Sequence, residues 1–165
     1  MTVKKETKSK KNQKKVNQLT VVKKLASKLV KNLKVKAQIS VTEDDQGLVH
    51  VQIETEDPGV LIGYHGETLS SLQLILAMML YRQTEEWIRI LINVGDYRER
   101  RRESLLRMAM SAVQRVKFSN ESQALPSMSS AERRIIHMEL ANYPEVETES
   151  EGEGSYRRVV VKPKT

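Results

Sequence analysis

The chain has 165 residues, of which 39% are hydrophobic and 30% are charged, and it contains no cysteine. Disulfides and thiolate metal sites are therefore excluded, and the three histidines are scattered along the chain. The longest strongly apolar run, residues 72–81, has about half of the roughly 20 residues that a membrane span needs. We expect a cytoplasmic protein with no membrane span and no cofactor.

The positive charge is concentrated at the N-terminus. The formal net charge is +7, but seven of the 28 basic residues and one of the 21 acidic residues lie within residues 1–16. A lysine-rich segment without apolar periodicity is typical of disorder, so the sequence predicts a disordered tail over residues 1–18. Two interpretations of the tail remain open: a solubilising end, or an arm that binds nucleic acid.

The first half of the chain alternates between helical and strand periodicity. Apolar residues recur every three or four positions in two segments, and they alternate with polar residues in three others. The predicted elements in chain order are a helix over 21–33, strands over 37–42 and 49–54 that form a hairpin, a glycine loop, a helix over 68–81 and a strand over 88–94. We assign this unit to residues 19–94.

The second half begins after Gly95. Asp96 with Glu99, and Ser129 with Glu132, have the spacing of a capping box, in which side chains bond the free backbone amides at a helix start. The predicted elements are helices over 96–116 and 129–141, a polar loop between them, and a closing hairpin that pairs the acidic segment 145–153 with the valine strand near the C-terminus. The sequence thus predicts an α+β fold with two small modules in tandem, the second over residues 95–165.

Two glycines, Gly63 and Gly66, precede the apolar helix predicted over 68–81. Paired glycines let the backbone lie close to a ligand and expose the first N–H groups of the next helix, which attract an anion. The spacing does not match the G-x-x-x-x-G-K-[ST] loop that binds nucleotide triphosphates. The pattern alone leaves two interpretations open, a phosphate-sized pocket and a tight structural turn.

The element order around "LIGYHGETLSSLQLIL" resembles a KH domain of the type II arrangement, over roughly residues 21–94. The resemblance implies an α-β-β-α-β order and a loop that clamps the backbone of about four nucleotides of single-stranded RNA. On this resemblance the RNA-binding residues are Ile62, Gly63, Tyr64, His65 and Gly66.

The middle of this loop departs from the pattern of the family, which often has lysine or arginine there. A histidine with an ordinary pKa near 6.5 is mostly neutral at pH 7, so His65 offers a hydrogen bond rather than a charge, and we expect weaker phosphate contact. Tyr64 either stacks on a base or has no role. We expect Gly66→Asp to weaken RNA binding without unfolding the protein.

Arg133 and His137 lie four residues apart and therefore on one side of a helix, where both side chains can reach a phosphate or stay solvated. The segments "YRERRRESL" and "ALPSMSSAERRIIHMEL", with the closing valine strand, resemble the R-3-H domain, a binder of single-stranded nucleic acid. The resemblance covers roughly residues 95–163 and implies helices packed on a small β-sheet. It places Arg133 and His137 at the two naming positions, with Arg134 beside them.

A type II KH domain followed at once by an R-3-H domain resembles the Jag/KhpB family of bacterial RNA-binding proteins. The N-terminal Jag-N domain of that family is not recognised in this sequence, and we expect it to be absent. The resemblance implies a post-transcriptional regulator or RNA chaperone that binds single-stranded RNA or single-stranded DNA. A ribosome or another KH protein is a further implied partner.

Four arginines crowd the first turns of the helix predicted over 96–116. The helix dipole and mutual repulsion both disfavour positive charge there, so local stability does not explain the cluster. An anionic partner would explain it, and neutralisation by neighbouring acids is the alternative. We include Arg98, Arg101 and Arg102 among the RNA-binding residues, and we assign the acidic segment 145–153 to a face turned away from RNA.

Two other classes of function compare with RNA binding as follows: an enzyme and a protein-interaction adaptor. An enzyme is not expected, because the sequence contains no recognisable pair of nucleophile and base and no metal-ligand spacing. The alternative to RNA binding is a protein-interaction adaptor, associated with the ribosome or a membrane insertase, in which the loop has lost RNA affinity together with its basic residues.

Overall fold

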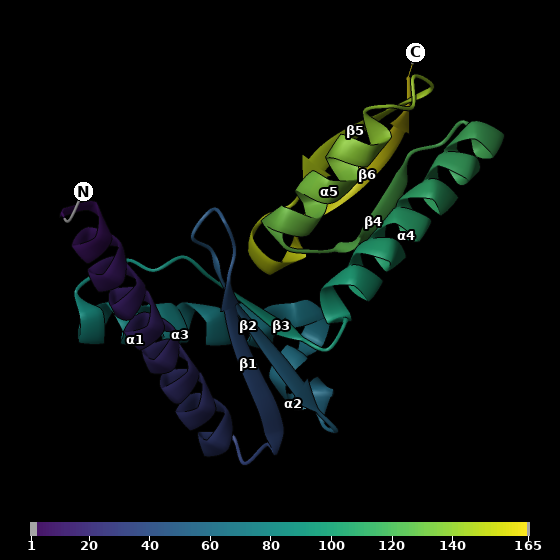
Figure 1. Ribbon diagram of the computed structural model, residues 1–165. Helices are drawn as coiled ribbons and strands as arrows, with labels where there is room; N and C mark the ends of the chain where they lie inside the picture. The colour runs from purple at the N-terminus through teal and green to yellow at the C-terminus, as the bar shows by residue number, and fades with distance from the viewer. Residues whose placement is uncertain (1–2, 165) are drawn as a thin grey trace. The chain divides into compact units, whose positions relative to one another are not determined.

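The computed structural model describes residues 3–164, with side chains from residue 17 onward. The chain divides into two compact units, Met1–Tyr97 and Arg98–Thr165, close to the change of pattern at Gly95. Each unit combines helices with one three-stranded sheet (Figure 1). The predicted α+β class with two small modules is confirmed.

The first unit carries its sheet in the order β1-β2-β3. Its elements are α1 (Val3–Asn32), β1 (Ala37–Glu43), β2 (Val49–Thr55), α2 (Pro58–Ile62), the single 3-10 turn η1 (Tyr64–Gly66), α3 (Glu67–Thr84) and β3 (Ile90–Val94). β1 and β2 are antiparallel, as the hairpin pattern predicts, whereas β2 and β3 are parallel. A parallel pair needs a long crossover connection, and α2, η1 and α3 provide it.

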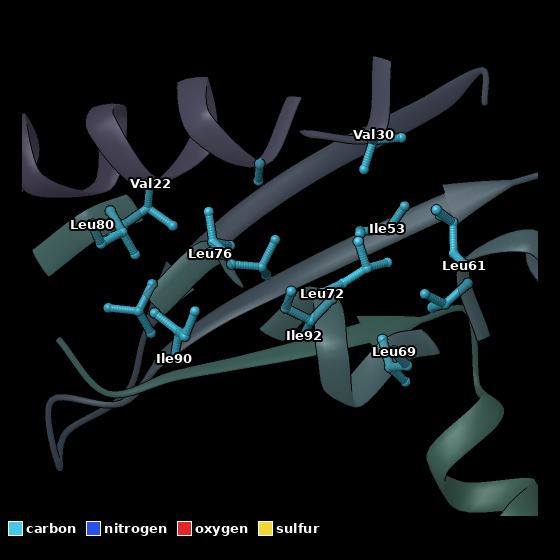
Figure 2. Packing of buried hydrophobic residues seen from close by; sticks show 14 of the residues in the cluster. Val22, Val30, Ile53, Leu61, Leu69, Leu72, Leu76, Leu80, Ile90 and Ile92 are labelled. Carbon is cyan, nitrogen blue, oxygen red and sulfur yellow. The ribbon is translucent and has the colours of Figure 1, made fainter. Parts of the chain in front are cut away.

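The apolar core of the first unit lies between its helices and one face of the sheet. Val49, Val51 and Ile53 of β2 are buried, and α3 buries residues at three- and four-residue steps. Figure 2 shows Val22 and Val30 of α1 pointing into the same cluster as Leu72, Leu76 and Ile53. Full burial of such a side chain contributes about 1.5–3 kcal/mol, so this cluster anchors the crossover to the sheet.

The N-terminal segment differs from its prediction. Residues 3–18, predicted to be disordered, belong to helix α1, which begins at Val3. Lysine and glutamine are good helix formers, and adding turns to an existing helix is easier than starting one. Residues 1–2 of the predicted tail, and the side chains before residue 17, lie outside the described part of the chain.

The second unit carries two helices and an antiparallel sheet in the order β4-β6-β5. Its elements are α4 (Tyr97–Ser119), β4 (Gln123–Ser127), α5 (Ser130–Leu140), β5 (Val146–Glu151), the 3-10 turn η2 (Gly154–Tyr156) and β6 (Arg158–Pro163). α4 and α5 share one buried cluster with Val159 and Val161 of β6. The predicted closing hairpin and the capping box of Ser129 and Glu132 are both confirmed.

Two short elements were missed. β4 lies within the predicted polar loop, because Pro126 and the single buried residue Leu125 give no strand signal. β4 is an edge strand with irregular register between Ala124 and Ser127, and such positions tolerate proline. α2 has only five residues, too few to show helical periodicity.

The turn between α2 and α3 requires glycine at two positions. Gly63 has φ 69° and ψ −168°, a conformation essentially restricted to glycine, and a Cβ atom there would lie 2.0 Å from Thr68 Oγ1. Gly66 is left-handed with φ 85°, and a Cβ atom there would lie 3.0 Å from the hydroxyl of Tyr97. Packing within the first unit therefore already accounts for both glycines.

Gly63→Ala is expected to lower the free energy of unfolding of the first unit by about 2 kcal/mol or more, because it combines backbone strain with a steric clash. Urea unfolding followed by the fluorescence of Trp87, the single tryptophan, measures this loss. Gly59→Ala is the matched control, since a Cβ atom at Gly59 meets nothing within 4 Å. Equal stability of the two variants would contradict the packing argument.

Candidate nucleic-acid interface

The glycine turn presents two exposed rings at its tip. Tyr64 is 69% exposed, and its ring lies 4.0 Å from the ring of His65, measured between centroids, at an interplanar angle of 40°. Ile62, the last residue of α2, is half-buried, and Gly66 is buried. Of the five residues predicted to contact RNA here, Tyr64 and His65 are therefore the ones whose side chains face solvent.

The start of α3 is a weaker anion site than the sequence suggests. Gly66 occupies the N-cap position and has no side chain that could accept a bond from the first N–H groups of α3. Glu67, however, is exposed in the first turn and places a carboxylate next to those groups. A negative charge at this position satisfies the helix dipole from within the chain and repels an incoming phosphate.

Tyr97 is a residue of this site that the sequence reasoning missed. Its hydroxyl packs over Gly66, although the two residues are far apart in the chain. No local signal reveals this contact, which depends on the return of the chain through β3. The contact also changes the expected effect of Gly66→Asp: that variant carries strain at a positive φ and crowds Tyr97, so it is not a clean test of RNA binding.

In the second unit, Arg101 joins the first turns of α4 and α5. Its Nε donates to Glu132 Oε1 at 2.7 Å, and both side chains are mostly buried. Glu132 Oε2 also accepts bonds from the backbone N–H and the hydroxyl of Ser129, both at 3.0 Å. Burial alone would raise the pKa of Glu132, but the bonds from Arg101 and Ser129 outweigh it and lower the pKa below its usual value.

The arginines clustered on α4 therefore differ in role and in exposure. Arg101 holds two helices together, and using it for RNA would leave a carboxylate unpaired. Arg98 is half-buried, whereas Arg102 is exposed. Of the three arginines predicted on this helix, Arg102 is the most open to a partner, and Arg101 has a structural role that the sequence pattern did not reveal.

His137 bridges α5 and β5. Its Nδ1 lies 2.7 Å from Thr148 Oγ1 and its Nε2 lies 2.8 Å from Ser150 Oγ, so both ring nitrogens are engaged. Burial of the ring, and next the positive charge of Arg133, lower the pKa of His137. The imidazole is therefore neutral at pH 7, and neither nitrogen remains for a phosphate while these bonds are in place.

Arg133 and Arg134 directly follow Glu132 of the capping box, where the first turn of α5 passes into the second. Arg133 is half-buried, and its Nε is buried with no hydrogen-bond partner among the described residues. Arg134 is exposed. The structure thus brings Arg133 close to His137, as the spacing predicts. The two side chains have different roles: the neutral imidazole connects α5 to the sheet, and the guanidinium provides the positive charge.

The acidic segment places its hydroxyl and carboxylate side chains on opposite faces of the sheet. Thr148 and Ser150 of β5 point toward α5, so the alternating Glu147, Glu149 and Glu151 lie on the opposite face of the sheet. Lys162 Nζ lies 2.6 Å from Glu149 Oε2 and 2.9 Å from Glu151 Oε1. These carboxylates are separated by the sheet from the helix that carries Arg133. The alternation of hydroxyls and acids is visible in the sequence and predicts that they lie on opposite faces of the strand, but it does not reveal that the hydroxyls meet His137.

Two further properties concern the described residues as a whole. No helix between residues 3 and 164 is both long enough and apolar enough to cross a membrane. Within the same range, no three histidine, aspartate or glutamate side chains are grouped closely enough to hold a metal ion.

We expect the pKa of His137 to lie below the ordinary value of about 6.5 in an NMR titration of its ring protons. Because the folded state disfavours the protonated ring, this group's contribution to stability is complete above about pH 6.5 and decreases as the pH falls toward the lower folded pKa. The melting temperature of the second unit should therefore fall on mild acidification, and His137→Gln should flatten that dependence. A pKa at or above 6.5 would contradict the bridging arrangement.

Comparison with known protein families agrees with this architecture. A family model of the KH domain of KhpA and KhpB proteins matches residues 20–92, and a model of the R-3-H domain matches residues 103–163. Together the two matches cover most of the chain and occur in the order predicted from the sequence. Both are nucleic-acid-binding domains, and neither is an enzyme.

Similar curated proteins are all called RNA-binding protein KhpB. The protein from Clostridium symbiosum is 35% identical over 130 residues, which cover 79% of this chain and 58% of the relative. The one from Streptococcus pneumoniae serotype 2 is 35% identical over 133 residues, covering 81% of this chain and 40% of the relative. The one from Bacillus subtilis is 31% identical over 131 residues, covering 78% and 62%. This chain thus spans about half the length of these relatives.

The family-model matches and the similar proteins agree with the tandem order of the two domains, the glycine turn and the helix that carries Arg133 and His137. The chain therefore belongs to the Jag/KhpB family of bacterial proteins.

Proposed function

We propose that this chain binds single-stranded RNA and acts in the cytoplasm as a post-transcriptional regulator or RNA chaperone. The observation that carries the proposal is the exposed pair Tyr64 and His65 at the tip of a glycine turn, in a chain whose relatives are named as RNA-binding proteins. Single-stranded DNA, which shares the bases and phosphates, is a second substrate of the same chemistry.

At the glycine turn, recognition depends on hydrogen bonds and stacking more than on charge. The backbone between Gly63 and Gly66 is held by packing on Thr68 and Tyr97, so the turn is preorganised before RNA arrives. Tyr64 offers an aromatic face, and His65 offers a ring nitrogen to the sugar or phosphate. The carboxylate of Glu67 opposes phosphate binding, which supports a modest affinity for this half.

The second proposed RNA-binding site lies at the start of α5. Arg133 and Arg134 supply positive charge, and Arg102 on α4 extends it. His137 acts in this proposal as a positioning residue that holds α5 on β5 and so sets the direction of Arg133. A guanidinium held in this way loses less side-chain entropy on binding a phosphate than a free one would.

His65→Asp should weaken binding of a fluorescein-labelled single-stranded RNA roughly fivefold in an anisotropy titration, because it places a carboxylate beside the backbone phosphate. His65 has φ 49°, a left-handed conformation that aspartate and asparagine tolerate, and its side chain is exposed. His65→Asn is therefore the matched neutral control and should bind nearly like the parent. If the aspartate variant also binds like the parent, the turn does not contact RNA.

Replacing both Arg133 and Arg134 with glutamine should reduce the salt dependence of RNA binding. Each phosphate contact to a single strand contributes about 0.7 to the slope of log affinity against log salt, so the slope should fall by roughly 1.4. Lys164→Gln, an exposed cation beyond the end of β6, is the control and should leave the slope unchanged. If removal of residues 1–16 instead abolishes all salt-sensitive affinity, the lysine-rich segment alone is responsible and the proposed sites are wrong.

A protein adaptor is the second candidate function, and one observation favours it. α3 exposes an apolar face of Leu74, Ile75, Met78 and Tyr81, with Tyr81 stacked on the exposed ring of Trp87 at 4.6 Å. Exposed apolar patches of this kind mark interaction surfaces. Failure of the full chain to bind single-stranded RNA, together with retained binding to a ribosome, would favour this function over the first.

A further inference from the structure

A pocket at the C-terminal end of α4 remains unused by the sites described above. It has a volume of about 460 Å³ and lies between the last turns of α4 and the start of β4. Its lining includes Ser111, Gln114, Arg115, Phe118, Glu121 and Gln123. This volume is within the range of about 300–1,000 Å³ that is usual for small-molecule sites.

Phe118 is the most exposed large apolar side chain of the described residues, at 95%. It is also the single phenylalanine of the chain. At this exposure the ring contributes nothing to the core, so folding does not explain an aromatic residue here. A free aromatic face beside a pocket is the feature on which nucleobases stack.

Arg115 is held in place at the edge of the same pocket. Its Nη1 donates to Ser111 Oγ at 2.7 Å, and its Nε donates to Gln123 Oε1 at 3.2 Å. The two bonds fix the plane of the guanidinium and leave further N–H donors on it. A guanidinium oriented in this way can stack on a base or bond a neighbouring phosphate.

A stripe of basic and polar residues leads along α4 to this pocket. Arg100, Arg107, Ser111, Gln114 and Phe118 recur at three-, four- or seven-residue steps and therefore share one side of the helix. The buried residues Leu105, Ala109, Ala112 and Val116 occupy the opposite side. Arg107 pairs with Glu103 at 3.5 Å, but both are largely exposed, and such pairs are weak. The outward side of α4 thus combines cations with an aromatic end.

We propose that this pocket binds a nucleobase of single-stranded RNA whose phosphates follow the stripe on α4. The inference rests on the proposed function and adds a contact site to it. In this arrangement Phe118 stacks on the base, and the guanidinium of Arg115 contacts the same nucleotide. Glu121 favours a base over a phosphate as the occupant, because its carboxylate repels the backbone from the interior of the pocket.

The test uses the full chain and a fluorescein-labelled single-stranded RNA of mixed sequence in anisotropy titrations over a range of salt concentrations. Phe118→Leu keeps an apolar side chain but loses the ring, and it should weaken binding roughly fivefold or more. Phe118→Tyr keeps the ring and should bind within about twofold of the parent. Because no phosphate contact is lost, the salt slope of Phe118→Leu should equal that of the parent.

Normal RNA affinity of Phe118→Leu would overturn this inference and leave the proposed function intact. An equal loss of affinity in Phe118→Leu and Phe118→Tyr would also overturn it, since stacking requires only the ring. If the parent chain itself binds no single-stranded RNA, both the proposed function and this site fall together.

Discussion

The lack of a Cβ atom at Gly63 is the constraint on which the candidate site of the first unit depends. The space that a Cβ atom would fill is taken by Thr68 in the first turn of α3, so α2 and α3 can join only through this turn. The leucines of α3 anchor it in the core, against the face of the sheet that β2 and β3 form with β1. The rings of Tyr64 and His65 are thereby carried at the tip of a turn fixed by the core.

In the second unit, polar residues of the motif hold the fold together. Arg101 and Glu132 form a largely buried pair between α4 and α5, and His137 bonds two hydroxyls of β5 with both ring nitrogens. Removing either partner would leave a buried polar group unsatisfied, which is costly. The motif residues therefore divide into those that hold the elements of the unit together and those, chiefly Arg133 and Arg134, that we propose to bind RNA.

Much of the fold was predictable because its signals are local. Alternation of polar and apolar residues identified β1, β2 and β3. The glycines between an acidic segment and a valine run identified the closing hairpin, and the spacing of Ser129 and Glu132 identified the start of α5. The misses also have local causes. β4 contains a proline and buries one residue, α2 has a single turn, and the lysine-rich segment continues a helix whose pattern begins only later in the chain.

The sequence by itself determined the order of the two domains, the position of the glycine turn and the family to which the chain belongs, since these depend on residue type and spacing along the chain. Only the tertiary structure decided which residues of each motif are used in packing contacts and which remain exposed to a binding partner. The packing of Tyr97 over Gly66 and the bonds from Arg101 to Glu132 and from His137 to Ser150 join residues from different elements. Side-chain spacing within one helix carries no information about such partners, because they are brought together only when the sheets and helices pack.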